Sequence, residues 1–284
     1  MGYDYDNNPQ GISASNNVFD FNLLKIKLIV DEQLKTKKIK ILEIGCGGGR
    51  NISALKYKYG DKISCFGVDI SETSINYAKK IMKDEFFIVG KTIDDYFQDE
   101  KFDIILLVDI LEHLDNFFDV EKTLERVSSK LKDSGDVFIS CPIESNPLCI
   151  LWFFDKLKIY KNITLDCFGH TNKFNKIEIL EIVKKHLNIS KVEYNFHFFT
   201  QLGYLVFYYF PKGIIKMVFS KKTQTFFRES NIEISNNFFN KYVLKIYHII
   251  KSPINLLGFI ESIIRRKSGF GAQNINIICK KRLS

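Results

Sequence analysis

The sequence lacks the motifs that mark disulfide-rich, metal-binding and secreted proteins. Its six cysteines lie far apart, and no pair has the C-x-x-C spacing of a zinc site or a thioredoxin-like redox motif. Four of them lie in apolar, strand-like runs, where a free cysteine is an ordinary core residue. The first ten residues, MGYDYDNNPQ, are acidic and polar, unlike a signal peptide. These features favour a reduced, cytoplasmic setting, and we expect no metal site.

Long apolar runs are also missing. A membrane span takes about 20 apolar residues, and the stretch LGYLVFYYF at 202–210 ends at Pro211 and Lys212. The chain has 284 residues, of which 45% are hydrophobic and 26% are charged. Length and composition therefore favour a globular protein with one large domain, or one domain with an elaboration.

Apolar runs and helical stretches alternate between residues 38 and 143. The runs are short, rich in β-formers and bounded by turn residues, as buried parallel strands are. We expect strands at 38–45, 63–70, 86–90, 103–110 and 136–143, and further strands at 189–199 and 271–281. Helices are expected at 20–36, between these strands, and at 176–187. A βαβα alternation predicts a parallel sheet covered by helices.

The helix before the fifth strand is predicted from its apolar spacing. Phe117, Val120, Leu124, Val127 and Leu131 recur at helical intervals. Gly135 follows this pattern, at a place where a helix C-cap is expected.

The stretch ILEIGCGGGRN at 41–51 contains the strongest chemical signal. Gly45, Gly47, Gly48 and Gly49 leave the turn after the first strand almost without β-carbons. In a parallel sheet, ligands bind beyond the carboxyl ends of the strands, and bare backbone can lie directly against them. Four glycines in five positions exceed what a tight turn needs, so the stretch predicts a ligand site.

The residues around these glycines distinguish between ligands. The dinucleotide fingerprint G-x-G-x-x-G requires a small residue where this chain has Arg50, and the G-K-S/T ending of a P-loop is absent. Glu43, before the first glycine, suits a cationic ligand and repels a pyrophosphate. Asp69, at the end of the second strand, can accept two hydrogen bonds from a ribose diol. The site is therefore predicted to bind a ribose and a positive centre.

Three motifs in order resemble class I S-adenosylmethionine (SAM)-dependent methyltransferases. They are EIGCGGG, GVDIS and FDIILLVDILEHLDN, and GHTNKF at 169–174 is a weaker fourth. The nearest likeness is to the small-molecule members, the type 11 and ubiquinone-biosynthesis O-methyltransferases. The resemblance covers roughly residues 38–190 and the last strand. It implies a Rossmann-like, doubly wound α/β fold with a seven-stranded sheet, mostly parallel, whose last strand is antiparallel.

The same resemblance assigns residues to the cofactor. The methionine part would face Glu43, Gly45, Cys46 and Gly47 on one side and Val108 and Asp109 on the other. Asp69 would hold the ribose hydroxyls, and Ile70 would pack on the adenine. The acid that usually contacts the adenine amine is replaced by Lys91, so Thr92 and Ile93 are the expected partners through their backbone groups, ahead of Asp94.

Two histidines are candidates for a general base. Transfer of a methyl group to an oxygen requires removal of a proton, and histidine titrates near neutral pH. His113 follows the fourth strand, and His170 lies in the loop after the fifth. Each also has a structural interpretation, as a residue that orders its own turn or loop.

Basic and aromatic residues are concentrated in residues 196–270. This part has eleven Lys and Arg against three Glu, an excess equal to the whole formal net charge of +8, and 17 of the 40 aromatics. We divide the chain into an N-terminal segment and helix (1–37), a methyltransferase core (38–199), a mainly helical insertion (200–270) and the last strand with a tail (271–284). Within the insertion, 238–252 fits an amphipathic helix.

The insertion is interpreted either as a helical cap over the site or as a surface for an anionic membrane or a lipid-linked acceptor. Residues 200–267, with the triplet Arg265-Arg266-Lys267, would form that surface at the inner face of a membrane. Nucleic acid is disfavoured, because the aromatics lie in dense apolar runs and no N-P-P-Y-like tetrad follows the fourth strand.

The leading hypothesis is O-methylation of a small molecule, glycan or lipid-linked intermediate, with SAM as cofactor. A non-catalytic, cofactor-binding assembly partner is the first alternative. An NAD-dependent oxidoreductase is the second, and Glu43 and Arg50 disfavour it. The sequence identifies neither the methyl acceptor nor the oligomeric state.

Overall fold

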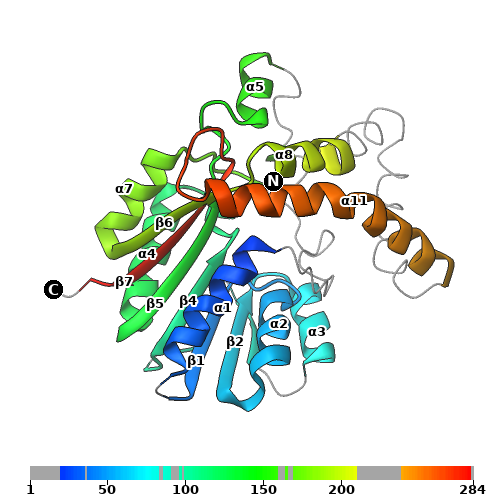
Figure 1. Ribbon diagram of the computed structural model, residues 1–284. Helices are drawn as coiled ribbons and strands as arrows, with labels where there is room; N and C mark the ends of the chain where they lie inside the picture. Colours follow the sequence, from blue (N-terminus) through cyan, green and yellow to red (C-terminus); the bar gives the residue numbers. More distant parts are fainter. Residues whose placement is uncertain are drawn as a thin grey trace.

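A seven-stranded mixed sheet forms the centre of the computed structural model (Figure 1). The model describes residues 20–282 apart from 36, 83–85, 91–95, 98, 159–163, 166–168 and 210–237. The strand order is β3-β2-β1-β4-β5-β7-β6. Only β7 runs antiparallel to its neighbours, β5 and β6, and the other pairs are parallel. The predicted Rossmann-like sheet with an antiparallel last strand is confirmed.

The strands and helices alternate as predicted up to β5. The strands are β1 (Ile39–Ile44), β2 (Ile63–Asp69), β3 (Phe86–Val89), β4 (Phe102–Val108), β5 (Leu131–Pro142), β6 (Leu187–Asn195) and β7 (Asn274–Lys281). The helices are α1 (Phe21–Gln33), α2 (Arg50–Tyr59), α3 (Glu72–Ile81), α4 (Phe117–Lys130), α5 (Ile150–Lys156), α7 (Lys176–His186), α8 (Phe198–Tyr204) and α11 (Phe238–Arg265). The 3₁₀ helices η1 (Gly60–Lys62) and η2 (Leu111–His113) and the π-helix η3 (Leu205–Tyr209) are the other named elements of the described residues.

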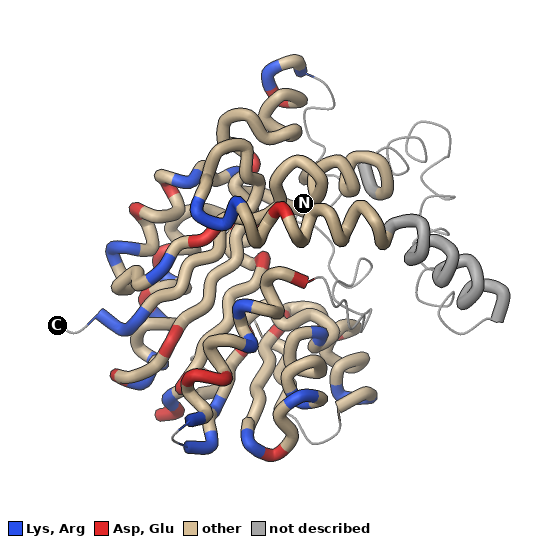
Figure 2. Tube along the Cα trace, viewed as in Figure 1, with Lys and Arg blue, Asp and Glu red and all other residues tan. Residues whose placement is uncertain are grey.

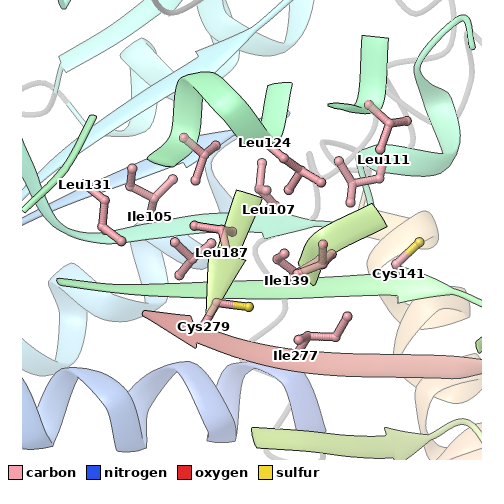
Figure 3. Close-up of a cluster of buried hydrophobic side chains, with 14 of the residues drawn as sticks. Ile105, Leu107, Leu111, Leu124, Leu131, Ile139, Cys141, Leu187, Ile277 and Cys279 are labelled. Carbon is pink, nitrogen blue, oxygen red and sulfur yellow. The ribbon is translucent and has the colours of Figure 1, made fainter. Parts of the chain in front are cut away.

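Side chains alternate between the two faces of the sheet, and helices cover both. In β4, Ile104 and Leu106 pack with α1, α2 and α3, whereas Ile105 and Leu107 pack with α4 and α7. Figure 3 shows the second cluster, in which Leu124 of α4 faces strand residues such as Ile139 and Ile277. Because both faces are buried, the strands read as continuous apolar runs.

Capping side chains define where the core helices begin. Each accepts a hydrogen bond from an amide of the first helical turn that would otherwise lack a partner. The caps are Asp20 for α1, Ser71 for α3, Asn116 for α4 and Asn175 for α7. Asn175 and Glu178 form a reciprocal capping box.

Helix α4 ends earlier than its apolar spacing predicted. Leu131 is extended and pairs with Phe102 of β4, so β5 begins at Leu131. Leu131 still reaches the cluster that Leu124 and Val127 enter, which explains its helical spacing. Gly135 is therefore a strand residue and not a C-cap. A β-carbon there would lie 3.0 Å from the carbonyl oxygen of Asp103.

The C-terminal helices lie beyond the carboxyl ends of the parallel strands (Figure 1). β6 ends at Asn195, short of the predicted 199, because α8 already begins at Phe198. β7 begins at Asn274 rather than at 271. α11 packs beside α8 and continues through Pro253, beyond the predicted limit of 252. Within the described part of the chain, none of the helices combines the length and the hydropathy that a membrane span requires.

Candidate active site

The turn after β1 depends on glycines at left-handed backbone angles. Gly45, Gly47 and Gly49 have φ values of 72°, 51° and 76°, which residues with a β-carbon rarely adopt. At Gly45 a β-carbon would also lie 2.6 Å from the Cδ1 atom of Ile110. The glycines therefore allow this turn to pass close to the segment that follows β4.

Asp69 connects this turn to the end of β2. Its Oδ2 atom accepts a 2.7 Å hydrogen bond from the amide of Gly47, and its Oδ1 atom accepts a 2.8 Å bond from the amide of Ser71. The carbonyl oxygen of Val68 accepts from the amides of Gly45 and Cys46, at 2.8 and 3.1 Å. The carboxylate thus lies at the glycine turn, and its role at a ribose stays a prediction.

Glu43 is a buried acid beside the same turn. The residue is 2% exposed, and its Oε1 atom accepts a 2.6 Å hydrogen bond from the side-chain amide of Asn51 in α2. Burial raises the pKa of Glu43 to about 8, against the lowering effects of Asn51 and Arg50. Among the described residues, its Oε2 atom has no hydrogen-bond partner. A cationic ligand would stabilise the ionised form of this carboxyl.

Asp109 supplies a third carboxylate, directly after β4. Its φ is 52°, its amide donates to the carbonyl oxygen of Ser140 at 2.9 Å, and its Oδ1 atom accepts from the Ser140 hydroxyl at 2.7 Å. Solvent reaches the residue, although protein atoms surround the carboxyl and desolvation raises its pKa. The hydrogen bond from the Ser140 hydroxyl lowers this pKa.

The remaining predicted cofactor residues differ in exposure. Cys46 is buried, and desolvation raises the pKa of its thiol well above the usual value, so it is an inert residue of the turn. Ile70 is 52% exposed after β2, and Val108 is half-buried at the end of β4. Arg50 forms an ion pair with Asp20 at the start of α1. Thr92 and Ile93, with Lys91 and Asp94, lie outside the described residues.

Three carboxylates thus gather where adjacent strands end. Glu43, Asp69 and Asp109 come from β1, from β2 and from the residue after β4, and these strands are neighbours in the sheet. Acidic groups at this density disfavour a polyphosphate, and a bound cation would favour their ionised forms. The arrangement suits a ligand that combines hydroxyl groups with positive charge.

The two candidate bases lie together. The rings of His113 and His170 are 4.8 Å apart between centroids and meet edge to face. The loop at 169–172 is tied to η2, where the amides of Thr171 and Asn172 both donate to the carbonyl oxygen of Glu112, at 2.9 and 3.0 Å. Residues far apart in the sequence therefore form one histidine pair.

Each histidine has a different partner. His113 Nδ1 is 3.3 Å from the carbonyl oxygen of Gly169, which only accepts, so this nitrogen carries the proton. Burial, together with the neighbouring His170, lowers the pKa of His113 to about 3. His170 Nδ1 lies 2.6 Å from the Oε1 atom of Glu144, a buried carboxyl. That contact leaves His170 Nε2 as the nitrogen that can act as a base.

Glu112 is a buried acid between the histidines. It is 1% exposed, and its Oε1 atom lies 3.8 Å from His113 Nε2 and 3.9 Å from His170 Nε2, beyond hydrogen-bond range. Neither carboxyl oxygen has a hydrogen-bond partner among the described residues. Burial raises the pKa of Glu112 well above its usual value. Glu112, His113 and His170 together could hold a metal ion, and this metal site was not predicted from the sequence.

Several residues of this site were missed from the sequence. Glu112 stands next to His113 in LEHLD, and that adjacency was the available signal. Asn51, Ser140 and Glu144 follow no recognisable motif, because their partners Glu43, Asp109 and His170 are distant in the chain or lie on other elements.

Known proteins share this architecture. Residues 35–188 match a protein-family model for the methyltransferase domain. The ubiquinone biosynthesis O-methyltransferase of Pelagibacter ubique is 32% identical over 188 residues, covering 61% of this chain and 76% of that protein. The enzyme of the same name from Coxiella burnetii (strain Dugway 5J108-111) is 30% identical over 123 residues, covering 42% and 50%. The match thus spans about half the length of the Coxiella relative.

A solved structure agrees at the level of the fold. The crystal structure of the plantazolicin methyltransferase BamL, in complex with a triazolic desmethylPZN analog and SAH, has a TM-score of 0.51 at 16% identity. The likeness covers 92% of this chain and 85% of that chain. The family match covers more than half of the chain and confirms the resemblance to class I enzymes. The chain therefore belongs to the methyltransferase-domain family.

Proposed function

We propose that this chain is a SAM-dependent methyltransferase that transfers a methyl group to an oxygen of its acceptor. The observation that carries the proposal is the set of three carboxylates, Glu43, Asp69 and Asp109, around a glycine turn. SAM combines a ribose diol with an α-ammonium group and a sulfonium. One carboxylate for the diol and two for the cationic part match this ligand, and none of them suits a pyrophosphate.

The cofactor would be held mainly by backbone and carboxylates. Asp69 would accept from the ribose hydroxyls, while Glu43 and Asp109 face the methionine part. The exposed Ile70 offers an apolar surface to the adenine. Thr92 and Ile93 keep their proposed role at the adenine amine, and Gly45, Cys46, Gly47 and Val108 keep theirs along the methionine chain.

The acceptor would be activated at the histidine pair. The acceptor oxygen attacks the methyl carbon, the carbon–sulfur bond breaks with its electron pair on sulfur, and the hydroxyl proton must leave. Glu144 holds His170 by its Nδ1 atom, so we assign the base to His170 Nε2 and an orienting role to Glu144. His113, neutral at any ordinary pH, would shape the site by its bond to Gly169.

A metal-assisted variant of this chemistry has an observation of its own. Glu112 is buried with both oxygens lacking a hydrogen-bond partner among the described residues, and two imidazoles face it. A divalent cation there would lower the pKa of an acceptor hydroxyl. Turnover after dialysis against a chelator separates the variants. If turnover is lost and then restored by added Mg²⁺, Mn²⁺ or Zn²⁺, the metal-assisted variant is supported. If turnover is unchanged, the histidine acts without a metal ion.

The acceptor is proposed to be a small molecule, a glycan or a lipid-linked intermediate. Two relatives are named ubiquinone biosynthesis O-methyltransferases, and this likeness supports the hydroxyl of a small molecule as the first acceptor to test. A panel of phenolic and glycosidic acceptors tests this proposal, with formation of S-adenosylhomocysteine (SAH) as the readout. Methyl transfer to nitrogen alone would exclude the proposed O-methylation.

An anionic membrane surface is proposed as a partner of the C-terminal helices. Figure 2 shows charges spread over α1 to α4 and few on α8 and the described part of α11. Leu256, Leu257, Ile260, Ile263 and Ile264 leave α11 with an exposed apolar stripe, and Ile264 is 75% exposed. The basic residues 265–267 flank it. These features support the proposal that a cytoplasmic protein associates peripherally with the inner face of a membrane.

Liposome flotation tests this surface. The triplet at 265–267 is a poor site for substitution, because Arg265 pairs with Glu261 and Arg266 with Glu193. The better variant is Leu257→Gln with Ile264→Gln. The matched control is Tyr57→Gln, since Tyr57 is 86% exposed on α2. We expect wild type and control to float with anionic vesicles at low salt and the double variant to stay behind. Equal flotation of all three would contradict the assignment.

Two rival functions make different predictions. A cofactor-binding assembly partner would bind SAH but turn over none of a broad acceptor panel. An NAD-dependent oxidoreductase would bind NAD⁺ and not SAH. Calorimetric titration with both ligands separates the second rival from the methyltransferase, and the acceptor panel separates the first.

A further inference from the structure

Four asparagines and a serine form a buried polar network next to Asp109. They are Asn22 of α1, Ser140 of β5, Asn195 of β6, and Asn274 and Asn276 of β7, and none is more than 8% exposed. Amide side chains are costly to bury unless they are hydrogen-bonded. Every deeply buried side-chain nitrogen or oxygen atom of these five residues has a hydrogen-bond partner. The network is therefore complete, and it joins four elements.

The direction of every bond in the network is fixed by its neighbours. Asn22 Oδ1 accepts from Asn195 Nδ2 at 3.1 Å and from Asn276 Nδ2 at 2.9 Å. Reversing the Asn22 amide would set its NH₂ group against two other donors. The Asn22 NH₂ group must therefore point the other way, where it donates to Ser140 Oγ at 2.9 Å.

Asn274 is fixed in the same manner. One hydrogen of its NH₂ group is shared between Asn195 Oδ1 at 2.9 Å and, more weakly, Asn276 Oδ1 at 3.3 Å. The other hydrogen is donated to Ser140 Oγ at 3.0 Å. A reversed amide would place its oxygen against two other oxygens. Two N–H donors thus converge on one hydroxyl.

These two donors determine what the Ser140 hydroxyl can do. A hydroxyl has two acceptor lone pairs and one hydrogen. Asn22 and Asn274 occupy both lone pairs, so Ser140 can only donate, and its hydrogen goes to Asp109 Oδ1 at 2.7 Å. Bonds aligned head to tail in a buried setting strengthen one another. The network therefore ends in a donor directed at one carboxylate.

Ser140 also holds the backbone of Asp109. Its carbonyl oxygen accepts from the Asp109 amide at 2.9 Å. Asp109 is in the left-handed region, with φ at 52°, where a residue with a β-carbon needs such support. No hydrogen bond from the described residues reaches Asp109 Oδ2, and solvent reaches the residue. One oxygen is held by Ser140, and the other accepts no hydrogen bond from the described residues.

We propose that Ser140 is a positioning residue that aims the Asp109 carboxylate at the α-ammonium group of the cofactor, with the asparagine network fixing its hydroxyl as a donor. The inference rests on the proposed SAM-binding function and deepens it. It assigns selectivity for the amino-acid part of the cofactor to residues of α1, β6 and β7, distant from the glycine turn.

The test compares two ligands that differ in that part. SAH carries the α-ammonium group, whereas 5′-methylthioadenosine has the same nucleoside without the amino acid. We expect Ser140→Ala to weaken SAH binding on the order of tenfold, the value of a charge-assisted hydrogen bond, and to leave methylthioadenosine binding unchanged. Asp109→Asn should show the same selective loss. The double variant should lose no more than Asp109→Asn alone, because both act through one carboxylate.

A purely structural network predicts a different pattern. Asn276→Ala is the matched control, since it removes a buried amide and leaves both donors to Ser140 in place. It should lower stability with little change in the preference for SAH. If Ser140→Ala does not fold, Ser140→Cys retains the packing with a weak donor, and a smaller selective loss is expected.

Three results overturn the proposal. The first is an equal loss of both ligands in the serine variants, and the second is an unchanged preference for SAH. The third is wild-type protein that binds neither ligand, which also removes the SAM-binding function itself. If the wild-type protein binds SAH and the serine variants keep its preference for SAH over methylthioadenosine, only the role of Ser140 is rejected and the SAM-binding function stands.

Discussion

The amide of Gly47 donates a 2.7 Å hydrogen bond to the carboxylate of Asp69, joining the glycine turn to the end of β2. Asp69 therefore has two tasks, holding the turn and facing the ribose. We predict that Asp69→Ala weakens SAH binding by about 1.5–3 kcal/mol, the scale of charge-assisted hydrogen bonds. Calorimetry on the folded variant measures this. Unchanged affinity would rule out the ribose assignment.

Glu43 should release a proton when the cofactor binds. Its pKa of about 8 leaves most of the carboxyl protonated at pH 7, and a cationic ligand favours ionisation. Calorimetric titration with SAM in buffers of different ionisation enthalpy should show release approaching one proton at pH 7. Glu43→Gln retains the Asn51 contact and should lose most of this release. Equal release in both proteins would assign the proton to another group.

The same carboxyl makes stability depend on pH. The folded pKa of Glu43 is raised to about 8 from the usual 4.5, so the folded state binds this proton more tightly than the unfolded chain does. The resulting stabilisation is complete below about pH 4.5 and is lost as the pH rises to 8 and above. Urea unfolding of the ligand-free protein should show this fall of a few kcal/mol. Glu43→Gln should flatten the profile over that range.

His170 should matter more for turnover than His113. Glu144 orients His170, and we expect His170→Ala to lower turnover by about 10²–10⁴-fold with SAH affinity kept. Glu144→Gln should reproduce part of that loss. His113, with a pKa of about 3, should contribute no ionisation to the rate profile between pH 5 and 9. A larger loss in His113→Ala than in His170→Ala would exchange the two roles.

Glu193 should anchor α11 to the core. It is 3% exposed and pairs with Lys25 of α1 at 2.7 Å and with Arg266 at 3.4 Å. Because Lys25 is itself buried, Glu193→Gln leaves a charge without its partner and should cost about 3–5 kcal/mol of unfolding free energy. Lys191→Gln is the control, since Lys191 is mostly exposed, and should cost less than about 1 kcal/mol. Equal costs would mean that burial of Lys25 is unimportant.

The core of the fold could be read from the sequence because its signals are local. β1, β2 and β4 are continuous apolar runs ending in a glycine or an acid, and their pairing follows from the βαβ connections. The start of β5 was not predictable, since Leu131 keeps helical spacing while its backbone is extended. The pairing of Leu131 with Phe102 makes Leu131 a strand residue, and this contact is not local in the sequence.

The site was predictable only where it follows a motif. Glu43, Asp69 and Asp109 stand at strand ends, and their gathering follows from the parallel sheet. Glu144 and the asparagine network carry no such signal, because an asparagine in a strand gives no periodic pattern and its partners lie on other elements. The same holds for Glu112, whose burial between His113 and His170 depends on a loop 56 residues away from η2 by sequence.

Calorimetric titration of the purified protein with SAH, with NAD⁺ as the comparison ligand, tests the central claim most directly. We predict one-to-one binding of SAH that Asp69→Ala weakens, and no heat of binding with NAD⁺. Binding of NAD⁺ without SAH, or of neither ligand by folded protein, would contradict the assignment of this site to a SAM-dependent methyltransferase.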